Sequence, residues 1–209
     1  MVTGGAFDIT VAPLMDLWGF TDRRYKVPDS ARIKETLKLV GSDKIILHPD
    51  DNMVEFSLPG MKIDLGGIAK GYALDCAVKK LKESGVKSCL IAAGQVYALG
   101  DKFGSPWTIR IKDPRRSGLS RKLQVKDVSV ATSGDYEQFF KVGGRRYCHI
   151  IDPRRGRPTE SGLASVTVIA SDGLTADALS TAIFVLGKEN GSKLAKELKI
   201  KCLIKQDQI

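Results

Sequence analysis

Residues 164–187, ASVTVIASDGLTADALSTAIFVLG, join the strongest strand signal of the chain to a clear helix signal. Residues 164–170 are a short apolar run rich in β-branched side chains, which is typical of a buried strand. From Thr175 to Gly187, apolar residues recur at helical spacing and place one side of a helix toward the interior. These buried-side residues are Ala178, Leu179, Ala182, Ile183 and Leu186. The stretch therefore predicts a strand followed by a helix.

Other segments predict a mixed fold in which strands outnumber helices. Ile33, Leu37 and Val40 indicate a helix that starts at residues 28–30 and stops at Gly41. Strands are expected at residues 44–48, 53–58, 88–94, 107–111, 128–134 and 147–151. A further short strand from Met61 is expected to run through glycines into a helix that ends near Gly85.

Expected strands that follow one another directly favour an α+β fold with largely antiparallel sheets over a regular βαβ series. The strand at residues 128–134 is expected to break into a turn of small residues. No internal repeat or linker is evident, so residues 1–209 are expected to form a single domain.

The composition is that of an ordinary globular protein. The chain has 209 residues, 43% of them hydrophobic, and a formal net charge of +9. Disorder, collagen-like repeats and coiled coils are excluded. No apolar run approaches the roughly 18 residues that a transmembrane helix needs, and residues 1–5 lack the features of a signal peptide.

The cysteines and the basic residues carry weaker signals. The four cysteines, Cys76, Cys89, Cys148 and Cys202, show no zinc spacing, and we interpret them as mostly buried small apolar residues. Residues 110–160 hold 13 basic and 6 acidic side chains. The basic stretch at residues 110–122 contains no aromatic residue, which argues against nucleic acid and leaves a solvated loop or a site for phosphate-bearing ligands.

Residues 64–71, DLGGIAKG, are a first candidate site. Glycines between a strand and a helix let backbone N–H groups and the helix N-terminus approach an anion. The segment is not a Walker A loop, because Lys70 precedes Gly71 and no hydroxyl follows. Taken alone, the glycines fit a tight turn beneath close packing as well as they fit a phosphate site.

Asp177 and Thr181 are a second candidate. A spacing of four places both side chains on one helical face, where they could share a hard cation such as Mg²⁺. In the alternative interpretation Asp177 favours the helix dipole near the N-terminus, and Thr181 bonds back to a carbonyl.

Two further segments are ambiguous. His149 is expected on a strand, facing the same side as Tyr147 and Ile151, where it is either a hydrogen-bonded core residue or a base. The small and hydroxyl residues 131–136 either line a ligand or form a turn.

Five ordered motifs together resemble the ApbE family, flavin transferases that take FAD and attach FMN to a threonine of a target protein. The motifs are VAPLMDLWGF (11–20), DLGGIAKGYALD (64–75), VATSGDY (130–136), HIIDPRRGRP (149–158) and ADALSTA (176–182). They are spread over nearly the whole chain.

The resemblance implies a set of roles. Mg²⁺ would be held by Asp177, Thr181 and the main-chain oxygen of Ala69, and His149 would be the base that prepares the acceptor hydroxyl. The FAD site would include Asp64, Gly66, Gly67, Lys70, Tyr72, Asp75, Thr132, Ser133 and Gly134. The threonine oxygen would attack the FMN-side phosphorus, and AMP would leave. The partners implied are FAD as substrate and an acceptor protein that carries the threonine, and the family suggests the cell envelope as the location.

Two departures from the family pattern accompany the resemblance. The family has a further N-terminal region, so this chain resembles its C-terminal two-thirds. Residues 93–96 read AGQV where relatives usually show AGGD. From these departures we expect weak FAD binding and poor transfer, with the phosphate-binding half retained. The alternatives are an FAD-binding module without transfer, hydrolysis of FAD to FMN and AMP, and a non-enzymatic partner that completes its pocket with another chain.

Overall fold

The computed structural model describes residues 2–115 and 119–207. Its contacts divide the chain into two compact units, each assembled from two separate stretches of sequence. The first unit comprises Met1–Leu65 and Asp135–Glu160, and the second comprises Gly66–Gly134 and Ser161–Ile209. Each expected site residue therefore belongs to one unit or the other.

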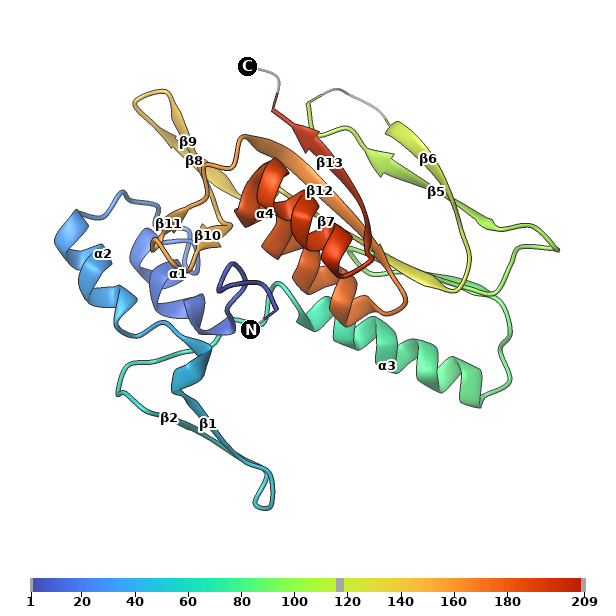
Figure 1. Ribbon diagram of the computed structural model, residues 1–209, viewed down its shortest axis with the longest axis horizontal. Coiled ribbons are helices and arrows are strands. Elements are labelled where there is room, and N and C mark those ends of the chain that lie inside the picture. The colour runs from blue at the N-terminus through green and yellow to red at the C-terminus, as the bar shows by residue number, and fades with distance from the viewer. Residues whose placement is uncertain (1, 116–118, 208–209) are drawn as a thin grey trace. The chain divides into compact units, whose positions relative to one another are not determined.

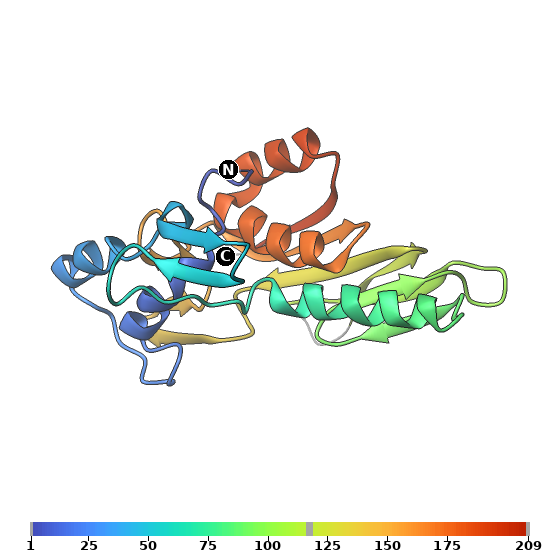
Figure 2. The same cartoon turned by 90° about the horizontal axis from the view of Figure 1, so that it is seen from below.

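The first unit is built from short elements around an aromatic and aliphatic core. Its helices are η1 (Ile9–Val11), α1 (Ala12–Trp18), α2 (Ser30–Leu37) and η2 (Ser42–Lys44). Its strands form three antiparallel pairs, β1 (Ile45–His48) with β2 (Met53–Phe56), β8 (Phe139–Val142) with β9 (Arg145–Cys148), and β10 (Ile151–Asp152) with β11 (Arg157–Pro158). Figure 2 shows the β1–β2 ladder.

Residues from both stretches of sequence form the core of this unit. Trp18, Phe20 and Ile33 from the first stretch pack with Phe140 and Ile151 from the second. The indole nitrogen of Trp18 also donates a hydrogen bond to the carbonyl oxygen of Gly156 at 2.9 Å. Helix α2 begins as predicted, because the Asp29 side chain accepts from Arg32 N.

The second unit contains a five-stranded antiparallel sheet with the order β13-β12-β7-β4-β3. Figure 1 labels β13, β12 and β7 of this sheet. These strands are β3 (Cys89–Ala92), β4 (Val96–Leu99), β7 (Val128–Gly134), β12 (Leu163–Ala170) and β13 (Lys201–Gln206). The unit also has α3 (Ala69–Glu83), α4 (Gly173–Glu197) and a separate hairpin of β5 (Trp107–Lys112) and β6 (Leu119–Val125). The expected α+β fold with antiparallel sheets is confirmed.

The two faces of the sheet are covered by different elements. Leu74 and Val78 of α3 pack against Tyr97 on β4, whereas the intervening Ala98 packs with Ile109 of β5 and with Val130. Because successive strand residues face opposite sides, α3 and the β5–β6 hairpin lie on opposite faces of β4. Helix α4 contacts β7 and β12.

Several local expectations are corrected. Residues 61–65 form no strand, and Ile63 and Leu65 within them are exposed. The strand expected at residues 147–151 is interrupted at His149, where the chain leaves β9 and β10 begins to pair with β11. The strand at residues 128–134 continues as β7 through Gly134, and the expected turn follows at Asp135 and Tyr136.

The C-terminal part of the chain holds two elements that the sequence analysis did not assign. Gly187, with φ 78° and ψ −179°, interrupts α4 where the helix was expected to end, but a second helical segment follows it. Strand β13 then adds an edge to the sheet beside β12.

The cysteines also depart from expectation. Only Cys148 is buried, whereas Cys76 is exposed and Cys89 and Cys202 are half-buried, and all four are free thiols. Burial raises the pKa of the Cys148 thiol to about 11.

Part of the basic stretch, residues 116–118, lies outside the described residues. None of the described helices is both long and apolar enough to cross a bilayer.

Candidate functional site

The carboxylate of Asp177 is the centre of a polar cluster in the second unit. Asp177 as a whole residue is 6% exposed, and its Oδ2 accepts hydrogen bonds from Gly71 N at 3.1 Å and from Gln95 Nε2 at 3.2 Å. A buried carboxylate needs such donors, because burial without them carries a large desolvation cost. The three residues come from α4, α3 and the β3–β4 turn, so the cluster exists only in the folded unit.

Two glycines let α3 and α4 approach closely enough to form this cluster. A Cβ on Gly71 would lie 2.1 Å from the carbonyl oxygen of Gly173, and one on Gly173 would lie 2.4 Å from that of Gly71. Both contacts are with backbone, which cannot move aside as a side-chain end can. Gly71 is therefore needed for close packing between the two helices, which was one of the two interpretations of the glycine segment, beside a phosphate site.

Two aspartates cap the N-terminus of α4. Asp75 Oδ1 accepts from Gly173 N at 2.6 Å, and its Oδ2 accepts from Leu174 N at 2.9 Å. Asp172 accepts from Thr175 N at 2.7 Å. Burial alone would raise the pKa of Asp172, but hydrogen bonds from Thr175 and Ser171 outweigh it and leave that pKa lowered. Asp75, expected beside FAD, therefore has both oxygens engaged by the protein backbone.

Ser133 and Thr132 lie on opposite faces of β7. Ser133 Oγ is 2.7 Å from Ser180 Oγ and 3.1 Å from Thr181 Oγ1, so it faces α4. Thr132 Oγ1 is instead 2.8 Å from Thr167 Oγ1 on the neighbouring strand. Because adjacent strand residues point to opposite sides, the structure brings Ser133, but not Thr132, to the Asp177 helix.

The residues before and within the first turn of α3 form the edge of the same cluster. Lys70 Nζ donates to Gly66 O at 2.8 Å and lies 4.0 Å from Asp177 Oδ1. Helix α3 starts at Ala69, and the side chain of its N-cap residue, Ile68, makes no capping hydrogen bond. In the first turn, Gly71 N donates to Asp177 Oδ2 on α4 instead. Tyr72, one position beyond Gly71, is 60% exposed.

One carboxylate and several neutral oxygens are the donor atoms that a hard cation such as Mg²⁺ would need at this cluster. The groups expected to hold it are the Asp177 carboxylate, the Thr181 hydroxyl one helical turn later, and the carbonyl oxygen of Ala69, the first residue of α3. Within residues 2–115 and 119–207, no group of three or more His, Cys, Asp or Glu side chains is placed to hold a metal. One carboxylate with neutral oxygens is the kind of set in which Mg²⁺ relies on substrate phosphates for further ligands.

Gln95 is the member of the cluster that the sequence analysis noted only as a departure from a motif. Its side chain is 5% exposed, and its Oε1 is buried without a hydrogen-bond partner in the described part of the chain. Nothing local predicts this position, because the neighbours that surround it come from α3 and α4. An orphaned buried oxygen beside a carboxylate fits a site that takes a cation.

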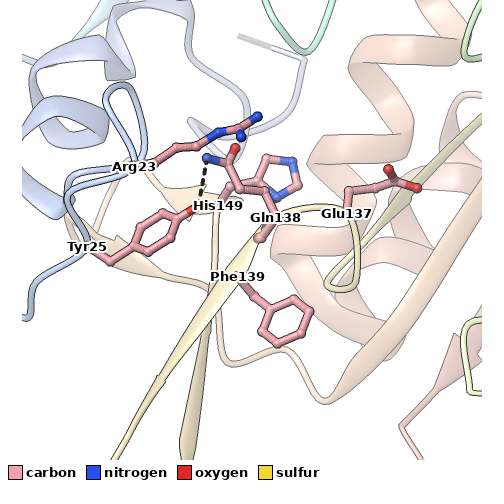
Figure 3. Close-up of a pocket in the computed structure, with 6 residues that line it drawn as sticks. All are labelled: Arg23, Tyr25, Glu137, Gln138, Phe139 and His149. Carbon is pink, nitrogen blue, oxygen red and sulfur yellow. Dashed lines mark hydrogen bonds between the residues drawn. The ribbon is translucent and has the colours of Figure 1, made fainter.

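His149 belongs to the first unit and lines a cavity of about 490 Å³. Figure 3 shows the lining side chains, which are Arg23, Tyr25, Glu137, Gln138, Phe139 and His149. His149 Nδ1 lies 3.1 Å from the carbonyl oxygen of Gln138, and its backbone N donates to the same oxygen at 2.9 Å.

This contact fixes the tautomer of the imidazole. A carbonyl oxygen only accepts, so Nδ1 carries the hydrogen and Nε2 keeps its lone pair in the neutral ring. A general base needs that arrangement.

Asp64 also belongs to the first unit, where its backbone N donates to Ile9 O at 2.7 Å. The other expected site residues lie in the second unit.

Comparisons with known proteins agree on one family. Residues 1–204 match the ApbE family. The FAD:protein FMN transferase of Haemophilus influenzae is 37% identical over 205 residues, which cover 94% of this chain and 59% of that protein. The protein of the same description from Klebsiella pneumoniae is 40% identical over 194 residues, which cover 91% of this chain and 60% of that protein.

Solved structures give the same result. The ApbE protein of Thermotoga maritima superposes with a TM-score of 0.89 at 43% identity, covering 97% of this chain and 67% of that one. The apo form of the Pseudomonas stutzeri flavinyl transferase ApbE gives 0.88 at 38% identity, covering 100% and 66%. The chain thus spans about 60% of the length of the curated relatives it matches. The resemblance carried by the five motifs is confirmed, and the chain belongs to the ApbE family.

Proposed function

We propose that this chain transfers FMN from FAD to a threonine of an acceptor protein, in a reaction that depends on Mg²⁺. The observation that carries the proposal is the buried Asp177 carboxylate, held by Gly71 N and Gln95 Nε2 with Thr181 one turn further along α4. Membership of the ApbE family supports the same assignment.

The second unit provides the groups that would hold the pyrophosphate of FAD. Asp177, Thr181 and the carbonyl oxygen of Ala69 would bind Mg²⁺, which when bound neutralises charge on the phosphate oxygens. The ammonium group of Lys70, 4.0 Å from Asp177 Oδ1, adds positive charge at the same cluster. Phosphoryl transfer depends mainly on positioning and charge neutralisation, so these groups match what the reaction requires.

His149 would act on the acceptor. Its Nε2 would take the proton of the threonine hydroxyl as the threonine oxygen forms a bond to the FMN-side phosphorus. The bond from that phosphorus to the bridging oxygen breaks, and AMP leaves with the electron pair. Because Gln138 O accepts from Nδ1, the ring is oriented and held in the tautomer that this step needs.

The direct test is incubation of the full chain with FAD, Mg²⁺ and a threonine-bearing acceptor peptide, followed by mass spectrometry. We expect addition of FMN to the peptide with Mg²⁺ and none with a chelator. A peptide with valine in place of threonine is the matched control.

An Asp177→Ala variant connects this test to the cluster. It should weaken FAD binding mainly when Mg²⁺ is present, because the lost carboxylate acts through the cation. Equal loss with and without Mg²⁺ would contradict the metal role. Release of FMN and AMP without peptide addition would show hydrolysis instead of transfer.

A further inference from the structure

We propose that the side-chain oxygen of Gln95 is a further ligand of the divalent cation at the Asp177 cluster. The inference rests on the proposed function, because it assigns a residue of this chain to the same cation. It concerns a position where the sequence departs from the usual motif of the family, so it describes a property of this chain's own site.

The burial of Gln95 is the first observation. The side chain is 5% exposed, yet Oε1 has no hydrogen-bond partner among the residues that the structure describes. Buried polar atoms in folded proteins nearly always have a partner, because an unpaired one loses its hydration without compensation. A bound cation would compensate this atom.

The orientation of the amide is the second observation. Gln95 Nε2 is 3.2 Å from Asp177 Oδ2. A carboxylate oxygen accepts hydrogen bonds, so the NH₂ end of the amide must face Asp177, and the opposite flip would set two acceptors against each other. Since Nε2 and Oε1 share one carbon, the unpartnered oxygen belongs to the same amide group that contacts the carboxylate proposed to bind the metal.

The backbone holds Gln95 in this position. It is the last residue of the three-residue turn between β3 and β4, and its carbonyl oxygen accepts from Ala93 N at 2.8 Å. Gly94 in the same turn has a φ of 74°, and a Cβ there would lie 3.3 Å from Lys70 Cδ. The turn therefore packs against Lys70, whose ammonium group lies 4.0 Å from Asp177 Oδ1.

The chemistry of the group also fits. Asn and Gln side-chain oxygens are ordinary ligands of hard cations, beside carboxylates and main-chain carbonyls. A carboxamide adds a ligand without adding charge, so Asp177 remains the one carboxylate of the proposed donor set. Such a site should hold a divalent cation weakly by itself and more strongly when pyrophosphate oxygens complete the coordination.

The test measures cation binding without turnover. Mn²⁺ replaces Mg²⁺, and electron paramagnetic resonance counts free Mn²⁺ in titrations of the full chain, alone and with ADP as the pyrophosphate probe. Metal-site mutations that disturb ligands or their supports typically cost 10- to 100-fold in affinity, so Gln95→Leu should weaken Mn²⁺ binding by about 10-fold or more.

A charged variant of Gln95 tests whether this side chain binds the cation or only fills space. Gln95→Glu should bind Mn²⁺ more tightly than the parent chain, and its melting temperature should rise more on Mn²⁺ addition, because the cation relieves repulsion between two carboxylates. Gln124→Leu is the matched control, since Gln124 is exposed and pairs with Thr108 on the β5–β6 hairpin. It should leave Mn²⁺ binding unchanged.

The outcomes distinguish this inference from the proposed function. If Asp177→Asn abolishes Mn²⁺ binding while Gln95→Leu and Gln95→Glu both bind Mn²⁺ like the parent, Gln95 only fills space and the inference is wrong. If Asp177→Asn also leaves Mn²⁺ binding intact, or if the parent chain binds no Mn²⁺ in either condition, the cation site itself is wrong.

Discussion

Replacement of Gly71 by alanine tests the contact on which the candidate site depends. The added Cβ would lie 2.1 Å from the carbonyl oxygen of Gly173 and 2.4 Å from its carbonyl carbon. Non-bonded atoms prefer separations of about 3.5–4.0 Å, so the starts of α3 and α4 must part by roughly 1 Å or more. The hydrogen bond from Gly71 N to Asp177 Oδ2, now 3.1 Å, would then be lost.

The substitution is expected to lower both the stability of the chain and the rate of FMN transfer. Overpacking costs roughly 1–3 kcal/mol. Alanine in a helix is favoured over glycine by about 1 kcal/mol, which offsets part of that cost. The lost hydrogen bond to the buried carboxylate adds about 1–3 kcal/mol. The net loss of about 1–5 kcal/mol corresponds to a fall in melting temperature of roughly 2–20 °C for a chain of this size. A displacement of about 1 Å at a reacting centre can in addition cost about 10²-fold in rate.

The assay compares melting by circular dichroism with Mg²⁺-dependent FAD binding and FMN transfer. Gly71→Ala should remain folded and lose most of its transfer rate. Lys79→Ala, an exposed change further along α3, should alter neither. Parental FAD binding and transfer in Gly71→Ala would refute the reasoning, because the helices would then tolerate separation without disturbing Asp177.

Three other predictions address separate parts of the molecule. His149→Ala should slow FMN transfer by about 10²–10⁴-fold while FAD affinity stays near the parental value. If the variant transferred FMN at the parental rate, His149 would be a structural residue and not the base. Asp172→Ala should cost about 1 kcal/mol at pH 7, measured by urea unfolding, because the cap on Thr175 N is lost. Since folding lowers the pKa of Asp172, the cap's pH-dependent stabilisation is complete above the unfolded pKa of about 3.9 and disappears as the pH falls through the folded pKa, so the difference between parent and variant should shrink at pH 3. At pH 8 a maleimide should label exposed Cys76 and spare buried Cys148, whose thiol pKa is about 11. Peptide mapping checks this, and labelling of Cys148 before Cys76 would contradict it.

The sequence by itself predicted those features that depend on neighbouring residues. The strand at residues 164–170 and the helix that follows it were read from side-chain periodicity, which reflects local geometry. The helix start at residues 28–30 was found for the same reason, because the Asp29 side chain and the N–H it accepts from are only three residues apart. The family was predicted from five ordered motifs, and the comparisons confirm it.

The pairing of strands was beyond local reasoning. His149 was expected within a continuous strand, but the chain there changes partners, from β8 to β11. Strand β13 was not assigned from the sequence, and it joins the sheet by pairing with β12. Tertiary context overrides weak local propensity in such segments.

The candidate site depends on contacts that no local pattern encodes. Gly71 and Asp177 are 106 positions apart, and Gln95 and Asp177 are 82 apart, yet they share one buried carboxylate. The sequence identified Asp177 and Thr181 by their spacing of four, which is a property of one helix. Only the tertiary structure decided that Gly71 is needed for close packing, that Ser133 and not Thr132 faces α4, and that Gln95 is buried beside the carboxylate, because each of these follows from which elements pack together.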